Sequence, residues 1–193
     1  MNISAIQISE RDIIEEWLLP LEEIEDPRLV ATRIFMTIWL TCTVLLGIPG
    51  NILIIAVVVM FKHLREVPHL LVINLAVSDL GVMLMSGLEL IGVFYGDTFL
   101  PKYPLLCEFS GVLCMSCCFA SLWTMMFIAI NRCMFICKQE IYDRFFGLKG
   151  TLLCIALIWI TVFLIDLPNF PFMGLAAHEF NPFYLHCTFK MDG

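Results

Sequence analysis

The stretch from Ile34 to Phe61, IFMTIWLTCTVLLGIPGNILIIAVVVMF, decides how the rest of the chain is interpreted. It contains 28 residues and no charged side chain. As a helix with a rise of about 1.5 Å per residue it would be about 42 Å long, and the hydrocarbon core of a bilayer is roughly 30 Å thick. The sequence therefore predicts a membrane-spanning helix over residues 34–61.

Three further apolar runs have the same character, and each exceeds the length of a helix buried in a soluble core. Strands of membrane barrels alternate apolar and polar side chains, and these runs do not alternate. The sequence therefore predicts an all-α membrane protein with four transmembrane helices. The later helices are expected at residues 70–96, 105–137 and 151–171, and the loops between the helices at 62–69, 97–104 and 138–150.

The overall composition agrees with this interpretation. Hydrophobic residues make up 60% of the 193 residues, charged residues make up 15%, and the mean hydropathy is +0.90. A soluble domain is about half apolar and about a quarter charged. These values exclude a disordered protein, a coiled coil and a typical cytosolic enzyme. The net charge of −7 also argues against a nucleic-acid partner.

The two ends of the chain are predicted to lie outside the cell. Residues 1–33 form an acidic tail, in which eight acidic residues face three arginines and no signal-peptide pattern is present. Lysine and arginine gather in the loops at 62–69 and 138–150, which are therefore expected in the cytoplasm. Residues 172–193 would then be an outside loop. Asn2 begins a glycosylation triplet that fits an outside N-terminus.

Asp79 is the deepest acidic residue in the predicted spans. A charge at mid-membrane costs a few kcal/mol, so Asp79 needs a cation, a proton or several hydrogen-bond donors. Asn51 on the first span and Ser121 on the third are its candidate partners. The alternative is a protonated carboxyl group that is hydrogen-bonded within the bundle. The segment Gly47–Asn51 also contains Pro49, which is expected to kink the first helix.

Several residues in fixed order resemble the rhodopsin-type seven-helix receptors over almost the whole chain. They comprise an asparagine after a glycine on the first span, an LAVSD stretch on the second, a cysteine and an arginine at the two ends of the third, and three later anchors. In this sequence they are Asn51, Leu75–Asp79, Cys107, Arg132, Trp159, Pro168 and Cys187.

The resemblance implies roles for these residues. Cys107 would form a disulfide with Cys187 outside the cell, and Asp79, Ser121 and Asn51 would hold a sodium ion in a complete receptor. Arg132 would be a switch contact for a G protein, although Asn131 precedes it where the family usually has an acid. A snorkelling membrane anchor is the alternative for Arg132.

Two further residues have structural roles by the same resemblance. Trp159 is expected to pack inward with its indole N–H reaching Asn74. Pro168 is expected near the outer end of the fourth helix.

A closer resemblance is to the melatonin-type receptors. It is carried by Ala129–Arg132, Ile136–Cys137, Tyr142–Asp143, Leu167–Asn169 and Cys187–Phe189. Cys133 and Met191 depart from that group, which has Tyr and Gln there. The chain is therefore expected to be a relative of the group rather than a melatonin receptor itself.

The resemblance also suggests a ligand pocket formed by Glu89, Cys114, Asn169 and Phe189. Cys114 stands where amine receptors carry Asp, which argues against a biogenic amine. Glu89 in the pocket would favour a cationic or donor-rich ligand. The alternative is that Glu89 reaches the outer headgroup region.

The expected function is G-protein-coupled signalling at the plasma membrane. Its partners would be a small extracellular ligand, a heterotrimeric G protein and the bilayer. Nothing up to Gly193 matches the family's fifth to seventh helices, so we expect an incomplete receptor that cannot signal alone. A four-span membrane scaffold and half of a transporter are the alternatives.

The remaining cysteines and histidines give weaker hypotheses. Cys114, Cys117 and Cys118 are expected to be packing residues rather than zinc ligands. Cys133 and Cys137 are candidates for acylation. The histidines, which are expected in loops, form no catalytic arrangement, so no enzyme is predicted; they are His63, His69, His178 and His186.

Overall fold

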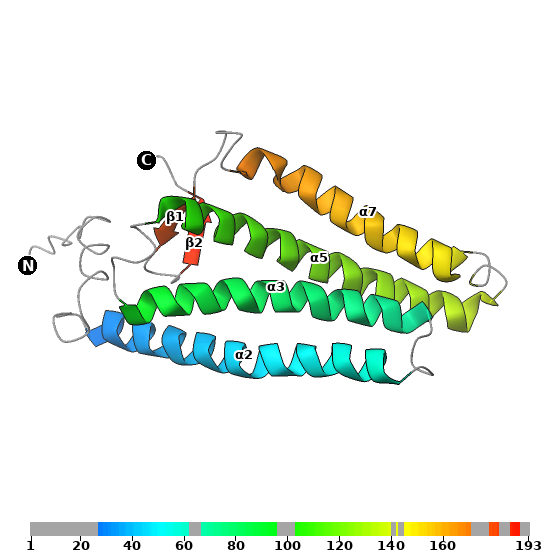
Figure 1. Ribbon diagram of the computed structural model, residues 1–193, viewed down its shortest axis with the longest axis horizontal. Coiled ribbons are helices and arrows are strands. Elements are labelled where there is room, and N and C mark those ends of the chain that lie inside the picture. The colour runs from blue at the N-terminus through cyan, green and yellow to red at the C-terminus, as the bar shows by residue number, and fades with distance from the viewer. Residues whose placement is uncertain are drawn as a thin grey trace, which may run out of the picture.

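The computed structural model describes residues 27–61, 67–95, 103–139, 142, 145–170, 178–181 and 186–189. This part of the chain contains four long helices, one turn of 3₁₀ helix and a two-stranded hairpin (Figure 1). In chain order they are α2 (Pro27–Met60), α3 (Val67–Tyr95), α5 (Pro104–Cys137), α7 (Leu148–Asp166), η2 (Leu167–Asn169), β1 (His178–Asn181) and β2 (His186–Phe189).

The four long helices run side by side, with α3 between α2 and α5 and with α7 against α5 (Figure 1). Each is long and apolar enough to cross a membrane. Large apolar side chains point away from the bundle, and Ile136 is 80% exposed. Lipid is the solvent that suits such a surface. The predicted all-α membrane fold with four membrane-crossing helices is therefore confirmed.

Helix α2 differs most from the prediction. It begins at Pro27, within the segment expected to be a tail. Proline suits the first position of a helix, because the N–H that it lacks would have no helical acceptor there. Pro49 lies inside α2, and Asn51 Nδ2 donates a hydrogen bond to the carbonyl oxygen of Gly47 at 2.9 Å. The helix therefore continues through its proline with a side-chain donor nearby.

The helices approach closely at glycines. A Cβ atom added to Gly81 on α3 would overlap Cys117 Sγ on α5. A Cβ atom added to Gly47 on α2 would lie 2.7 Å from Met83 Sδ on α3. Lipid tails are as apolar as the helix surfaces, so the hydrophobic effect does not bring membrane helices together. Close van der Waals packing of this kind does so instead.

The hairpin of β1 and β2 was not predicted. The strands are antiparallel, and His178 pairs with Phe189 while Asn181 pairs with His186. The hairpin lies at the end of the bundle where α5 begins (Figure 1). His178 and His186 are in these strands, within the segment expected to be an outside loop. His69 is in the first turn of α3, so its expected loop position is wrong. His63 lies outside the described residues.

Candidate functional site

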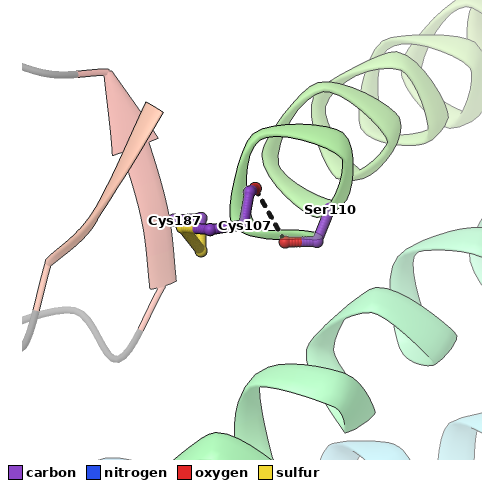
Figure 2. The surroundings of a disulfide bond; sticks show 3 residues. All are labelled: Cys107, Ser110 and Cys187. Atoms are coloured by element: carbon purple, nitrogen blue, oxygen red, sulfur yellow. Dashed lines mark hydrogen bonds between the residues drawn. A yellow bond between two sulfur atoms is a disulfide. The ribbon is translucent and has the colours of Figure 1, made fainter. Parts of the chain in front are cut away.

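A disulfide joins the hairpin to the first turn of α5. The Sγ atoms of Cys107 and Cys187 are 2.07 Å apart, and both residues are almost fully buried. Figure 2 shows the bond between β2 and the helix, with the hydroxyl of Ser110 donating to the carbonyl oxygen of Cys107 at 2.9 Å. The structure therefore contains the disulfide that the resemblance implied, and this bond fixes the hairpin over one end of the bundle.

Asp79 and Ser121 meet between α3 and α5. Ser121 Oγ donates a hydrogen bond to Asp79 Oδ1 at 2.6 Å. Asn51, the other candidate partner, donates within its own helix, and no hydrogen bond joins it to Asp79 among the described residues. The carboxyl and hydroxyl oxygens are hard ligands, which suit a hard cation in chemical kind. No group of three or more His, Cys, Asp or Glu side chains with metal-site geometry occurs in the described part of the chain.

A polar network links three helices at mid-bundle. Asn74 Nδ2 on α3 donates to Thr124 Oγ1 on α5 at 2.8 Å, and Trp159 Nε1 on α7 donates to Asn74 Oδ1 at 2.9 Å. Asn74 and Thr124 are both buried. Sequence reasoning placed the indole against Asn74 but missed Thr124. A hydroxyl in the middle of an apolar run was the available signal.

A second pair that the sequence analysis missed lies between α5 and α7. Ser116 Oγ donates to Asp166 Oδ2 at 2.5 Å, and Asp166 is only 2% exposed. An acidic residue within a membrane span is a functional hypothesis by default, and this was the signal available in the sequence. The carboxyl group is accommodated by burial against a serine on the neighbouring helix.

Asn131 and Arg132 lie near the end of α5 that is opposite the disulfide. Asn131 is 2% exposed and its Nδ2 atom has no hydrogen-bond partner, whereas the side chain of Arg132 is exposed. No described residue forms an ion pair with Arg132. The adjacent cysteines, Cys133 and Cys137, are exposed at the same end.

Aromatic side chains gather beside this end of α5. Tyr142 packs edge-on against Phe135 with ring centroids 5.2 Å apart, and it stacks on Phe146 at 5.5 Å. These contacts hold Tyr142 between Phe135 of α5 and Phe146. Phe135, which is three residues after Arg132, therefore anchors an aromatic cluster on the last turns of α5.

The proposed pocket residues are only partly described. Cys114 is buried on α5, and Asn169 is half-buried in η2 next to Pro168. Glu89 belongs to α3 and Phe189 to β2, but their side chains lie outside the described structure, as does Asn2. The structure therefore places Glu89, Cys114, Asn169 and Phe189 on α3, α5, η2 and β2.

Comparison with known proteins now identifies the family. The family described as "7 transmembrane receptor (rhodopsin family)" matches residues 50–193. The chain is similar to Melatonin receptor type 1B-A of Danio rerio, with 30% identity over 77% of this chain and 50% of the relative. It is also similar to Melatonin receptor type 1B-B of Danio rerio, with 34% identity over 76% and 41%.

A human relative gives the same result. Melatonin receptor type 1B of Homo sapiens is 32% identical over 78% of this chain and 40% of the relative. The chain thus spans about half, or less, of the length of these receptors. Because this family consists of receptors, the family match argues against the four-span scaffold and the half-transporter. The chain therefore belongs to the rhodopsin family of seven-transmembrane receptors and is related to the melatonin receptors.

Proposed function

We propose that these residues form part of a plasma-membrane receptor that binds a small extracellular ligand and activates a heterotrimeric G protein. The observation that carries the proposal is the exposed Arg132 beside the buried Asn131, at the end of α5 opposite the disulfide. The family match supports it. No described residue pairs with Arg132, so its side chain is available to a carboxyl-bearing or carbonyl-bearing surface of a partner protein.

The proposed topology follows from the positions of the disulfide and the basic residues. Disulfides form in oxidising compartments, so Cys107, Cys187 and the hairpin would face the outside. Arg132 and the loops at 62–69 and 138–150 would face the cytoplasm. Cysteine introduced at Glu66 should resist a membrane-impermeant maleimide added to intact cells. Rapid labelling there would refute the orientation.

Coupling can be tested in a chimera. Residues 50–193 of this chain would replace the matching stretch of Melatonin receptor type 1B of Homo sapiens. In the chimera that also carries Met191→Gln, melatonin-stimulated nucleotide exchange should fall at least about tenfold with Arg132→Ala, because a charge-assisted contact to the partner is lost. Lys138→Ala, which removes a nearby exposed charge, is the matched control and should change exchange little. Equal effects of the two variants would contradict the proposed role of Arg132.

We further propose that the ligand differs from melatonin, because Met191 stands where the resemblance expects Gln. Replacing an amide with a thioether removes a hydrogen-bond donor and leaves only a weak acceptor. The same chimera should bind radiolabelled melatonin poorly, and Met191→Gln should restore part of the binding. High-affinity binding without this substitution would refute the proposal.

We propose that a complete seven-helix receptor binds sodium at Asp79 and Ser121, and that Asn51 belongs to the same site. The ion would supply positive charge to a carboxyl group within the membrane, and the two side chains would supply oxygen ligands. Agonist affinity of the chimera should lose its sodium dependence with Asp79→Asn, which keeps the shape and removes the charge. Retained dependence in that variant would exclude this site.

A further inference from the structure

Two observed contacts define how α7 lies against α5. Ser116 on α5 is hydrogen-bonded to Asp166 on α7, and four residues further along α5, Ala120 packs in one cluster with Val162, four residues back along α7. The helices are therefore antiparallel in a fixed register. Eleven residues beyond Ala120 along α5 is Asn131, and eleven residues back from Val162 along α7 is Thr151. The register therefore places Asn131 opposite Thr151.

The helical rotation agrees with this placement. Asn131 is seven residues after Thr124, and Thr151 is seven residues before Ile158, so each lies on the same side of its helix as that residue. Thr124 is part of the polar network that includes the indole of α7, and Ile158 is buried against Ala120 of α5. Both polar side chains are thus on the sides of α5 and α7 that face each other, and the two helices pack side by side (Figure 1).

Asn131 and Thr151 also share an unusual state. Asn131 is 2% exposed and Thr151 is 0% exposed, and both Asn131 Nδ2 and Thr151 Oγ1 have no hydrogen-bond partner in the described structure. A buried polar group without a partner is costly, and most such groups in native proteins are hydrogen-bonded. Nδ2 is a donor, whereas Oγ1 both donates and accepts. A single molecule with donors and acceptors would satisfy both atoms.

We propose that Asn131 and Thr151 form a binding site for one internal water that bridges α5 and α7. The water accepts a hydrogen bond from Asn131 Nδ2 and exchanges one with Thr151 Oγ1, an arrangement that buried waters commonly adopt. Thr151 is then a positioning residue, because it turns the side chain at position 131 toward α7 and away from Arg132. This role of Thr151 is independent of G-protein coupling.

The first test detects the water in the 193-residue chain reconstituted in lipid nanodiscs. Infrared spectra in H₂O and in H₂¹⁸O should differ by an O–H stretching band of an internal water. The band should remain in Thr151→Ser, which keeps the hydroxyl, and in the control Thr161→Val, which lies on an exposed face of α7. It should disappear in Thr151→Val. A band that survives in Thr151→Val, or that is missing from the wild-type chain, overturns the proposal.

The second test measures the positioning effect on Arg132. In Asn131→Asp, the Thr151 hydroxyl should hold the new carboxylate toward α7, so phenylglyoxal should still modify Arg132 rapidly. Adding Thr151→Val should release the carboxylate to pair with Arg132 and slow the modification by about twofold to fivefold. Equal rates with and without Thr151→Val overturn the positioning role. If Thr151→Val does not fold, Asn131→Leu replaces it in the infrared test and must also lose the band.

Discussion

The hydroxyl of Ser116 on α5 donates a hydrogen bond to the carboxyl group of Asp166 on α7 at 2.5 Å, and both side chains are buried. This is the contact nearest the end of α7, because the helix gives way to the 3₁₀ turn of η2 directly after Asp166. The end of α7 is therefore attached to α5 by a polar contact, one turn beyond the apolar packing of Val162 with Ala120.

Removing the donor from this pair should destabilise the bundle. Ser116→Ala leaves the carboxyl group of Asp166 buried without a donor, and we expect the free energy of unfolding in bicelles to fall by about 1–2 kcal/mol. Ser110→Ala removes a buried serine whose hydroxyl bonds within its own helix, so it is the matched control. The double variant Ser116→Ala/Asp166→Leu should recover most of the loss. An additive double variant would contradict the pairing.

Replacing the indole donor should weaken the network at mid-bundle. Trp159→Phe leaves Asn74 Oδ1 without its donor, and the expected loss of unfolding free energy is about 1 kcal/mol. Trp123→Phe makes the same change of ring at an exposed position of α5 and should cost clearly less. In an Asn74→Leu background, Trp159→Phe should also cost less. Chemical denaturation monitored by circular dichroism measures all four variants.

A methyl group at Gly81 should force α3 and α5 apart. The added Cβ would overlap Cys117 Sγ, and overpacking of this kind costs about 1–3 kcal/mol. Gly50→Ala meets no atom within 4 Å and should leave the thermal midpoint unchanged or raise it. Adding Cys117→Ala to Gly81→Ala should restore part of the stability. An unchanged midpoint for Gly81→Ala would show that the helices do not approach as described.

The disulfide should resist reduction while the bundle is folded. Cys107 and Cys187 are almost fully buried, and thiol–disulfide exchange requires access to a sulfur atom. A water-soluble reductant should therefore open the bond much more slowly than a maleimide labels the exposed Cys137. Denaturant should speed the reduction strongly, because unfolding exposes the two sulfur atoms. Fast reduction of the folded chain, measured by mass spectrometry, would contradict the burial of this bond.

The helices were predictable because the membrane leaves the backbone few choices. Without water to satisfy its polar groups, a spanning segment forms a helix, so the apolar runs at 105–137 and 70–96 correspond closely to α5 and α3. The start of α2 at Pro27 was not predictable from hydropathy, because a helix continues beyond the apolar run wherever its own hydrogen bonds can form. The hairpin was missed because its two strands have only four residues each.

Partners across helices were harder to predict than the helices. The sequence indicated that Asp79 needs donors, but it did not decide between Ser121 and Asn51. An asparagine can satisfy itself on the carbonyl four residues earlier in its helix, and Asn51 does so. The pairing of Ser116 with Asp166 depends on the antiparallel register and on the rotation of two helices. Neither is visible in a single apolar run.

The network of Asn74, Thr124 and Trp159 has a consequence for the order of assembly during synthesis. Thr124 orients the amide of Asn74, and both belong to helices that leave the ribosome before α7. The acceptor for the indole of Trp159 is therefore already fixed when α7 reaches the bilayer. Helix α7 can join a preformed pair of helices without first reorganising it, and the indole N–H of Trp159 finds its acceptor already in place.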